Sequence, residues 1–227
     1  MKIGVVIAME KEYRLIKETL GDACEVEING IKFTKGSAGS NEIILTMCGI
    51  GKVNAAIGAV EMIGSFKPDA IISSGVAGGA SADLEVQDVV VSSETAYHDL
   101  YCGKESAYGQ VPGMPEIFVC DKELLGKALS IDCGTRIKDG LIVTGDWFVD
   151  SKEKMGNILD HFPKAKAVDM ESAAIAQVCY KYNVRFLSFR IISDIPLKDN
   201  KGEMYFNFWD TVANKSFSVT KAFLESL

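Results

Sequence analysis

Three acidic residues, Glu12, Glu171 and Asp194, have side chains suited to chemistry on a bound ligand. Carboxyl groups donate and accept protons in general acid–base catalysis. Asp194 ends the apolar run RFLSFRIIS, two residues before Pro196, at the end of a predicted buried strand. A carboxylate there is costly unless it is paired or used, and ligands bind at such strand ends in open α/β sheets.

A helix–strand unit must position two of these acids. Glu171 is paired with Asp169, and a run of small or apolar residues follows with the i, i+3, i+4, i+8 spacing of one buried helix face. These residues are Met170, Ala173, Ala174 and Val178. Asn183 breaks the pattern, and the run RFLSFRIIS that follows favours a strand buried in a sheet.

Glu12 lies just after the first predicted strand, the β-branched run from Lys2 to Ala8. A helical pattern then begins with Glu10, Lys11 and Glu12 in its first turn. The helix dipole favours acids in a first turn, so simple capping explains Glu12. The same turn lies at the carboxyl end of a strand, where ligands bind in such folds. Both interpretations of Glu12 stay open.

Two further segments have ambiguous roles. The Gly-rich segment from Gly75 to Ala80 follows a predicted strand and would let a ligand approach the backbone, although a tight turn also explains it. It matches neither a dinucleotide-binding GxGxxG motif nor a Walker loop. His98 could be a base oriented by Asp99, but such a histidine is more often structural. His161 is expected on the surface, and no motif indicates a Ser-His-Asp triad or a metal site.

Aromatic side chains gather in loops. The loop from Gly145 to Val149 carries two rings that could fill the core or stack on a flat heterocycle. The stretch from Leu100 to Pro115 is rich in Gly and aromatic residues and is expected to be a surface loop, a lid or a subunit contact. A second aromatic group, expected as core or pocket wall at the start of the last helix, is Tyr205, Phe206, Phe208 and Trp209.

Strands and helices alternate along the chain, with a hairpin from Glu25 to Lys35 that turns at Asn29-Gly30. A helix is expected after Gly51, with apolar positions Val53, Ala56, Ile57, Val60 and Ile63. Further strands are expected at Glu42 to Cys48, Asp69 to Ser74, Val86 to Tyr97 and Thr135 to Thr144, and helices at Asp121 to Ser130 and Ser151 to Leu159. This order predicts an α/β fold: a three-layer αβα sandwich around a mixed, twisted central sheet, in one domain spanning residues 1–227.

Composition limits the partners. With 48% hydrophobic residues the chain can bury a sizeable core, and its net charge of −7 without a basic cluster argues against nucleic acid and acidic membranes as partners. No apolar run is long enough to span a membrane. The six cysteines have no CxxC spacing and are expected to be mostly buried thiols, which favours a reducing, cytoplasmic setting.

Several short motifs, spread over essentially the whole chain, together resemble those of a known enzyme family. In order, the motifs are IGVVIAMEKE, GIGKVNAA, SSGVAGG, YHD, YGQVPG, GDxF, AVDMESAAIAQVC and RIISD. Together they resemble the 5′-methylthioadenosine/S-adenosylhomocysteine nucleosidases of the nucleoside phosphorylase superfamily. The resemblance implies a phosphorylase/hydrolase-like fold, a small-molecule nucleoside substrate, a homodimer, and neither a cofactor nor a metal ion.

The resemblance also implies roles for individual residues. Glu12 would be the general base that activates water. Asp194, held by Ser193, would protonate adenine at N7. Glu171 would hold the ribose hydroxyls, with Met170 and Arg190 beside it. Phe148 would stack on adenine and the backbone of Val149 would read its edge. The remaining pocket residues implied are Met9, Ile50, Ala77, Gly78 and Phe206.

The proposed reaction requires such groups on physical grounds. Cleaving an N-glycosidic bond develops positive charge on the ribosyl ring and negative charge on the base. A proton donor at the base and a carboxylate beneath the sugar stabilise these charges, and a second carboxylate activates the water. Burial at a strand end favours the proton that Asp194 must hold.

The chain departs from the family pattern at four places. Val76 replaces a small polar residue in the Gly-rich loop, and Asp169 replaces a Glu beside Met170. The stretch from Tyr101 to Ala107 differs from the loop with which relatives cover the 5′ substituent. Two extra residues lie between Asp194 and Phe206, which weakens the assignment of Phe206.

Three alternatives remain from the sequence. A phosphorylase would use phosphate in place of water, but it would place an arginine where this chain has Ser73. A nucleosidase for another 5′-substituted adenosine, such as aminofutalosine, would share the adenine and ribose groups. A non-catalytic nucleoside-binding relative would be expected to lose one of the three acids, and all three are present.

Overall fold

The computed structural model describes residues 1–198, 201–209 and 213–227. The strands in that part of the chain are β1 (Lys2–Ile7), β2 (Gly21–Ile28), β3 (Ile31–Ala38), β4 (Asn41–Met47), β5 (Ala70–Gly79), β6 (Val89–Tyr97), β7 (Phe118–Val119), β8 (Ile137–Thr144), β9 (Ala165–Asp169) and β10 (Arg185–Asp194). The helices there are α1 (Glu10–Lys17), α2 (Lys52–Phe66), α3 (Lys122–Leu129), α4 (Lys152–His161), α5 (Ser172–Tyr182), α6 (Lys201–Asn207) and α7 (Ala213–Ser226). The predicted mixed α/β fold is confirmed.

One mixed sheet contains all of these strands. Its order is β10-β6-β8-β9-β5-β1-β4-β3-β2, with β7 beside β6. Strand β10 also pairs in parallel with β5, so β5, β9, β8, β6 and β10 close into a ring of hydrogen-bonded strands. The other half, from β1 to β2, stays open and ends in the predicted hairpin. The sheet is therefore more strongly curved than the twisted sheet that the sequence predicted.

The central strands are buried on both faces, which explains their continuous apolar runs. Every residue of β5 from Ala70 to Gly75 is buried, and every residue of β10 after Arg185 is buried. Strands β1, β5 and β10 run parallel to one another, so their carboxyl ends meet at the same edge of the sheet. Glu12 follows the first of these ends and Asp194 forms the last.

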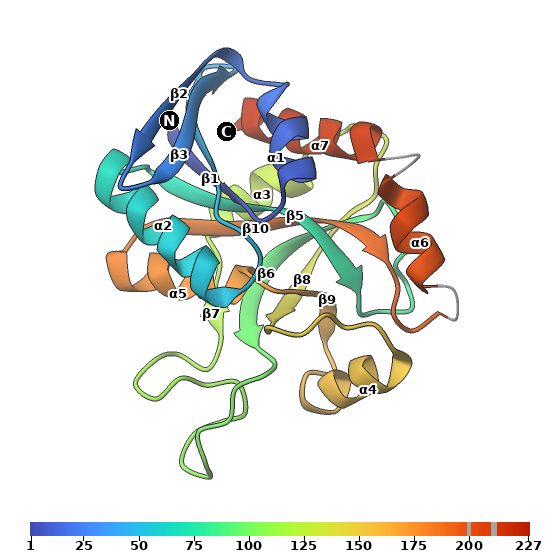
Figure 1. The fold of residues 1–227 in the computed structure, drawn as a ribbon. Coiled ribbons are helices and arrows are strands. Elements are labelled where there is room, and N and C mark those ends of the chain that lie inside the picture. Colours follow the sequence, from blue (N-terminus) through green and yellow to red (C-terminus); the bar gives the residue numbers. More distant parts are fainter. Residues whose placement is uncertain (199–200, 210–212) are drawn as a thin grey trace.

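Helices cover both faces of the sheet. Figure 1 shows α2 and α5 together on one side and α1 and α7 on the other, and α3 packs with α7. Two helix ends match their predicted signals. Ser151 caps α4 by accepting the Lys154 N–H, and Asn183 ends α5 in the left-handed conformation.

Helix α2 forms where the sequence predicted it, but most of the apolar positions named for it do not lie on its buried face. Its buried residues are Ala55, Gly58, Ala59, Met62 and Ile63, which the structure places against the sheet and α5. Val53, Ile57 and Val60 are instead exposed. The helix is apolar nearly all round, so its sequence periodicity did not distinguish the side that faces the core.

Other predictions need smaller corrections. The single last helix is described as α6 and α7, and residues 210–212 between them lie outside the described part, as do residues 199–200 of the predicted polar loop. Only Cys120 and Cys179 of the six cysteines are fully buried, and all six are free thiols. Within the described residues, no helix is long and apolar enough to cross a membrane.

Candidate active site

A cavity of about 120 Å³ lies at the carboxyl ends of β1, β5, β9 and β10. Of the sequence-predicted residues, twelve line it: Met9, Glu12, Ile50, Ala77, Gly78, Phe148, Val149, Met170, Glu171, Arg190, Ser193 and Asp194. The structure therefore brings the three acids to one cavity from three distant segments of the chain.

Glu12 is held at the junction between β1 and α1. Its carboxylate accepts the backbone N–H of Met9 at 3.1 Å, at the helix N-terminus, and that of Val76 at 2.8 Å, across on β5. Glu12 is buried, and this burial raises its pKa from 4.5 to about 7, against the opposing effect of Arg190. A carboxyl group with a pKa near neutrality is suited to accept a proton at physiological pH.

Gly75 leaves the space in which Glu12 meets Arg190. A Cβ atom at this position would lie 2.7 Å from Arg190 Nη1 and 2.8 Å from Glu12 Oε1, far inside van der Waals contact. The Gly-rich segment is thus more than a turn. It allows a carboxylate and a guanidinium to approach the backbone of β5 closely.

A buried arginine organises the acidic pair at the end of β9, where Asp169 is the last strand residue and Glu171 follows. Arg190 Nε lies 2.9 Å from Asp169 Oδ2, and Arg190 Nη2 lies 3.5 Å from Glu171 Oε2. Glu171 Oε1 also accepts the Gly51 N–H at 3.0 Å. Burial raises the pKa of Glu171, and Arg190 opposes that rise. Asp169 therefore holds Arg190 beside Glu171.

Asp194 stands at the last position of β10 and is buried. The hydroxyl of Ser193 donates to Asp194 Oδ1 at 2.7 Å. The pairing of β10 with β5 shifts its register between Ile192 and Asp194, opposite Ala77 and Gly78. The bulge places Ser193 and Asp194 together at the cavity, next to the Gly-rich segment.

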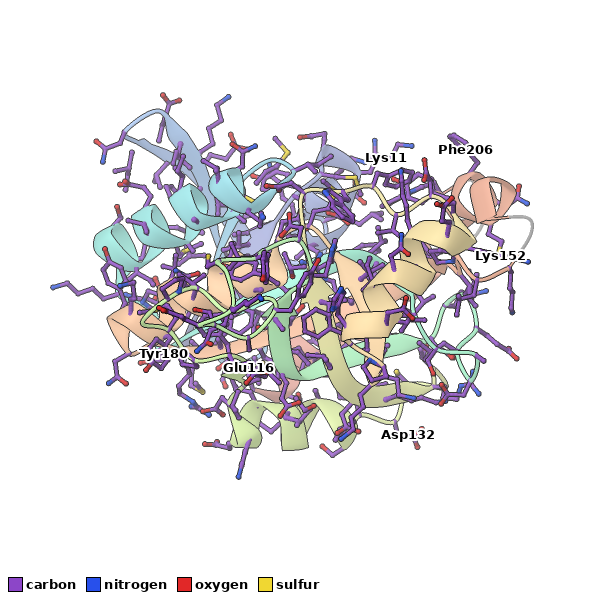
Figure 2. The ribbon with its side chains drawn as sticks, turned by 90° about the horizontal axis from the view of Figure 1, so that it is seen from below. Lys11, Glu116, Asp132, Lys152, Tyr180 and Phe206 are labelled. Atoms are coloured by element: carbon purple, nitrogen blue, oxygen red, sulfur yellow. The ribbon has the colours of Figure 1, made fainter. Side chains whose placement is uncertain are left out.

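Aromatic side chains close the cavity on the side facing solvent. Trp147 and Phe148 come from the loop after β8, and the Phe148 and Tyr205 rings meet edge to face with centroids 6.1 Å apart. Phe206 was predicted to line the pocket, and the structure does not place it there: its side chain is 69% exposed and lies at the periphery in Figure 2. Successive helix residues point in different directions, so Tyr205 faces inward from α6 and Phe206 faces out.

His98 does not line the cavity. It is buried behind the loop after β8, its ring edge-on to Trp147 with centroids 5.5 Å apart, and Asp99 binds Lys52 instead. Burial lowers the pKa of His98. This geometry favours the structural interpretation of His98 over the catalytic one.

Among the described residues, no group of three or more His, Cys, Asp or Glu side chains is arranged to hold a metal ion.

Six residues line the cavity that the sequence did not assign to it: Ala8, Val76, Trp147, Val168, Asp169 and Tyr205. For Tyr205 and Trp147 the sequence analysis had left both a core and a pocket position open. Each is adjacent in sequence to a residue that was predicted or to a strand end. Ala8 and Val168 lie beside the ends of β1 and β9, so strand termination was the signal that could have identified them.

Comparisons with known proteins show the family of this chain. The model of the phosphorylase superfamily matches residues 2–226. The 5′-methylthioadenosine/S-adenosylhomocysteine nucleosidase of Staphylococcus aureus (strain JH9) is 40% identical over 231 residues, covering 99% of this chain and 100% of that protein.

Solved structures show the same fold. A nucleosidase of this name from S. pneumoniae, with the transition-state inhibitor MT-ImmA, superposes with a TM-score of 0.92 at 33% identity, covering 100% of this chain and 99% of that one. One from Colwellia psychrerythraea 34H, in complex with adenine, has a TM-score of 0.90 at 35% identity and covers 100% and 96%. This chain therefore belongs to the 5′-methylthioadenosine/S-adenosylhomocysteine nucleosidase family within the phosphorylase superfamily.

Proposed function

We propose that this protein hydrolyses the N-glycosidic bond of 5′-methylthioadenosine and S-adenosylhomocysteine, releasing adenine and the thioribose product. The observation that carries this proposal is the meeting of Glu12, Glu171 and Asp194 at one buried cavity. The activity named for the relatives and the inhibitor and adenine bound in solved structures support it.

On the adenine side, we assign Asp194 as the general acid that delivers a proton to N7. The Ser193 hydroxyl, 2.7 Å from Asp194 Oδ1, fixes the direction of the carboxyl group. Protonation lowers the barrier to departure because the leaving base no longer carries the full negative charge. Phe148 stacks on the purine ring and the backbone of Val149 reads its edge in this arrangement.

On the sugar side, Glu171 accepts hydrogen bonds from the ribose hydroxyls. Arg190 and the Gly51 N–H hold the Glu171 carboxylate in place, so little reorganisation is needed as positive charge develops on the ring. Glu12 takes a proton from the attacking water. Its carboxylate is oriented by two backbone N–H groups and has a pKa of about 7, which suits a base at neutral pH.

Apolar and small residues shape the rest of the binding site in this proposal. Tyr205 takes the wall position that the sequence assigned to Phe206. The remaining contacts are assigned to Met9, Ile50, Ala77, Gly78 and Met170.

The arginines favour water over phosphate as the nucleophile. Of the four in the sequence, only Arg190 lines the cavity, and its guanidinium already contacts Asp169, Glu171 and the Ser73 hydroxyl, the last at 2.8 Å. Arg14, Arg136 and Arg185 each pair with an acid elsewhere. A phosphate dianion would therefore meet carboxylates and no uncommitted arginine.

We also propose a cytoplasmic homodimer. The long segment between β6 and β7 extends away from the rest of the fold in Figure 1, and it includes the divergent stretch from Tyr101 to Ala107. The exposed apolar stripe Val53, Ile57 and Val60 on α2 provides a surface that a second copy would cover.

The test is an adenine-release assay with purified protein on methylthioadenosine, adenosylhomocysteine and aminofutalosine, each with and without phosphate. We expect adenine release from methylthioadenosine and from adenosylhomocysteine, and for each of them the rate should be the same with and without phosphate. Release that requires phosphate would identify a phosphorylase. Preference for aminofutalosine would identify a different 5′ specificity, and binding of nucleoside without release would identify a non-catalytic relative.

A further inference from the structure

Three charged side chains lie behind the cavity, and none of them lines it: Lys52, Asp99 and Asp146, here called the Lys52 cluster. Lys52 begins α2, Asp99 follows β6 by two residues, and Asp146 lies in the loop after β8. Lys52 Nζ lies 2.7 and 2.6 Å from the two carboxylate oxygens of Asp99, whose side chain is only 7% exposed. An ion pair this sheltered is less screened by salt than one at the surface.

Backbone hydrogen bonds close the Lys52 cluster into a ring. Asp99 Oδ2 accepts the Asp146 N–H at 2.8 Å, and Asp146 Oδ1 accepts the Lys52 N–H at 2.8 Å. Lys52 is the first residue of α2, so Asp146 supplies an acceptor to an N–H that the helix itself leaves unpaired. Asp146 thus caps a helix from a loop distant in the sequence.

The Lys52 cluster connects two walls of the cavity. Asp146 directly precedes Trp147, Phe148 and Val149, all of which line the cavity. On the other side, the residue before Lys52 is Gly51, whose N–H binds Glu171 Oε1 at 3.0 Å. The aromatic wall and the carboxylate assigned to ribose are therefore joined through the start of α2.

The aromatic wall needs such support because it buries little surface of its own. Trp147 is 46% exposed and Phe148 is 57% exposed. Val149 packs in the core at the far end of the loop, so the polar contacts at Asp146 hold the end that carries the two half-exposed rings, and their loss frees that end to move. The absence of a side chain at Gly51 leaves room for the Asp146 carboxylate, because a Cβ atom there would lie only 3.1 Å from Asp146 Oδ1.

We propose that the Lys52 cluster positions the aromatic loop and Glu171 relative to each other for nucleoside binding. Its members do not touch the scissile bond, so they are positioning residues for the proposed nucleosidase activity, on which this inference rests. When the cluster is lost, Glu171 keeps its contact with Arg190, so the stabilisation of charge on the ribosyl ring is largely retained. The main effect should therefore fall on nucleoside binding, with a raised KM and a small change in kcat.

The experiment compares Asp146→Ala and Lys52→Met with two controls. Asp146→Asn keeps Oδ1 as an acceptor for the Lys52 N–H. Asp83→Ala removes ion pairs with Lys138 and Lys166 at an exposed site outside the cavity. All four are made in a Trp209→Phe background, which leaves Trp147 as the only tryptophan of the two in the chain. Steady-state kinetics, acrylamide quenching of Trp147 and thermal unfolding are measured for each.

We expect Asp146→Ala and Lys52→Met to raise KM about tenfold, the effect of losing one hydrogen bond to a charged group, with kcat within about threefold. Trp147 should become more accessible to acrylamide in both variants while each stays folded. Asp146→Asn should stay within about threefold of the parent in KM, and Asp83→Ala should match it.

Folded Asp146→Ala and Lys52→Met proteins with parental KM and parental quenching would overturn the proposal. A raised KM without a change in Trp147 quenching would also contradict it, because the loop would not have moved. If the parent protein released no adenine at all, the proposed function would fail. The quenching comparison would still decide whether the cluster holds the loop.

Discussion

Glu12 shows how one side chain serves the fold and the site together. The sequence left two interpretations open, capping and function, and the structure joins them. The carboxylate accepts the N–H of Met9 at the start of α1 and that of Val76 on β5, while it lines the cavity. The local sequence predicted the first contact, but the second depends on how β1 and β5 pair and was beyond any local pattern.

The pH dependence of activity should follow Glu12. A general base works in its ionised form, and burial raises the pKa of Glu12 to about 7. We therefore expect kcat/KM for methylthioadenosine to fall as pH drops through 7, approaching about tenfold per pH unit well below it. Glu12→Gln should lose on the order of 10²-fold or more in rate, and its residual activity should lack this acidic limb. A wild-type profile flat from pH 5 to 8 would contradict the role.

The same pKa makes a prediction about stability. The folded-state pKa of Glu12, about 7, lies above its ordinary value of 4.5, so the folded protein binds more protons than the unfolded chain between these values. The contribution of Glu12 to stability is thus present below pH 4.5 and lost as pH rises to 7. Glu12→Gln should be more stable than wild type at pH 8, by up to about 3 kcal/mol, and similar at pH 4.5. Urea unfolding at both pH values measures this, and an equal difference at both would refute it.

At the level of helices and strands, apolar runs predicted the buried strands well because β1, β5 and β10 are covered on both faces. The same reasoning failed for α2. Apolar residues surround this helix, and most of the positions with helical spacing that the sequence analysis named lie on its exposed side. It also could not predict that β10 pairs with both β5 and β6, since this ring forms between segments distant in the sequence.

Gly75, the first residue of the Gly-rich segment in β5, gives a direct test at the level of helices and strands. Gly75→Ala would place a methyl group 2.7 Å from Arg190 Nη1 and 2.8 Å from Glu12 Oε1. Because both groups are buried, we expect the variant to lose activity by on the order of 10²-fold and to be destabilised by about 1–3 kcal/mol, as in overpacked cores. Gly64→Ala, where nothing lies near the added atom, is the control. Normal turnover and stability of Gly75→Ala would show that the site relaxes freely.

For the whole molecule, the carboxyl ends of three strands bring the three acids together: β1 and β10 run parallel to β5, and β9 runs antiparallel to it. Their positions were predicted mainly through a family resemblance, and the structure places twelve of the thirteen expected residues at the cavity. The prediction for Phe206 was wrong because a resemblance transfers only sequence positions, whereas the direction of a side chain on α6 depends on packing. The Lys52 cluster escaped prediction because its members come from three segments that only the fold brings together.

The proposed homodimer makes a prediction at the same scale. Ile57 is 53% exposed on the outer stripe of α2, between Val53 and Val60. Ile57→Lys would place a charge in a covered apolar interface, and we expect it to shift the protein from dimer to monomer in sedimentation at micromolar concentration. Lys67→Glu at the end of α2 serves as a charge-changing control. A wild-type protein that sediments as a monomer would contradict the proposal.

The most direct test of the central claim is the rate of adenine release by Asp194→Asn at saturating methylthioadenosine. An amide cannot donate the proton that the leaving base needs, so the predicted loss is about 10²- to 10⁴-fold in a folded variant that still binds the nucleoside. Release at the wild-type rate would contradict the assignment of Asp194 and, with it, the mechanism built on the three acids.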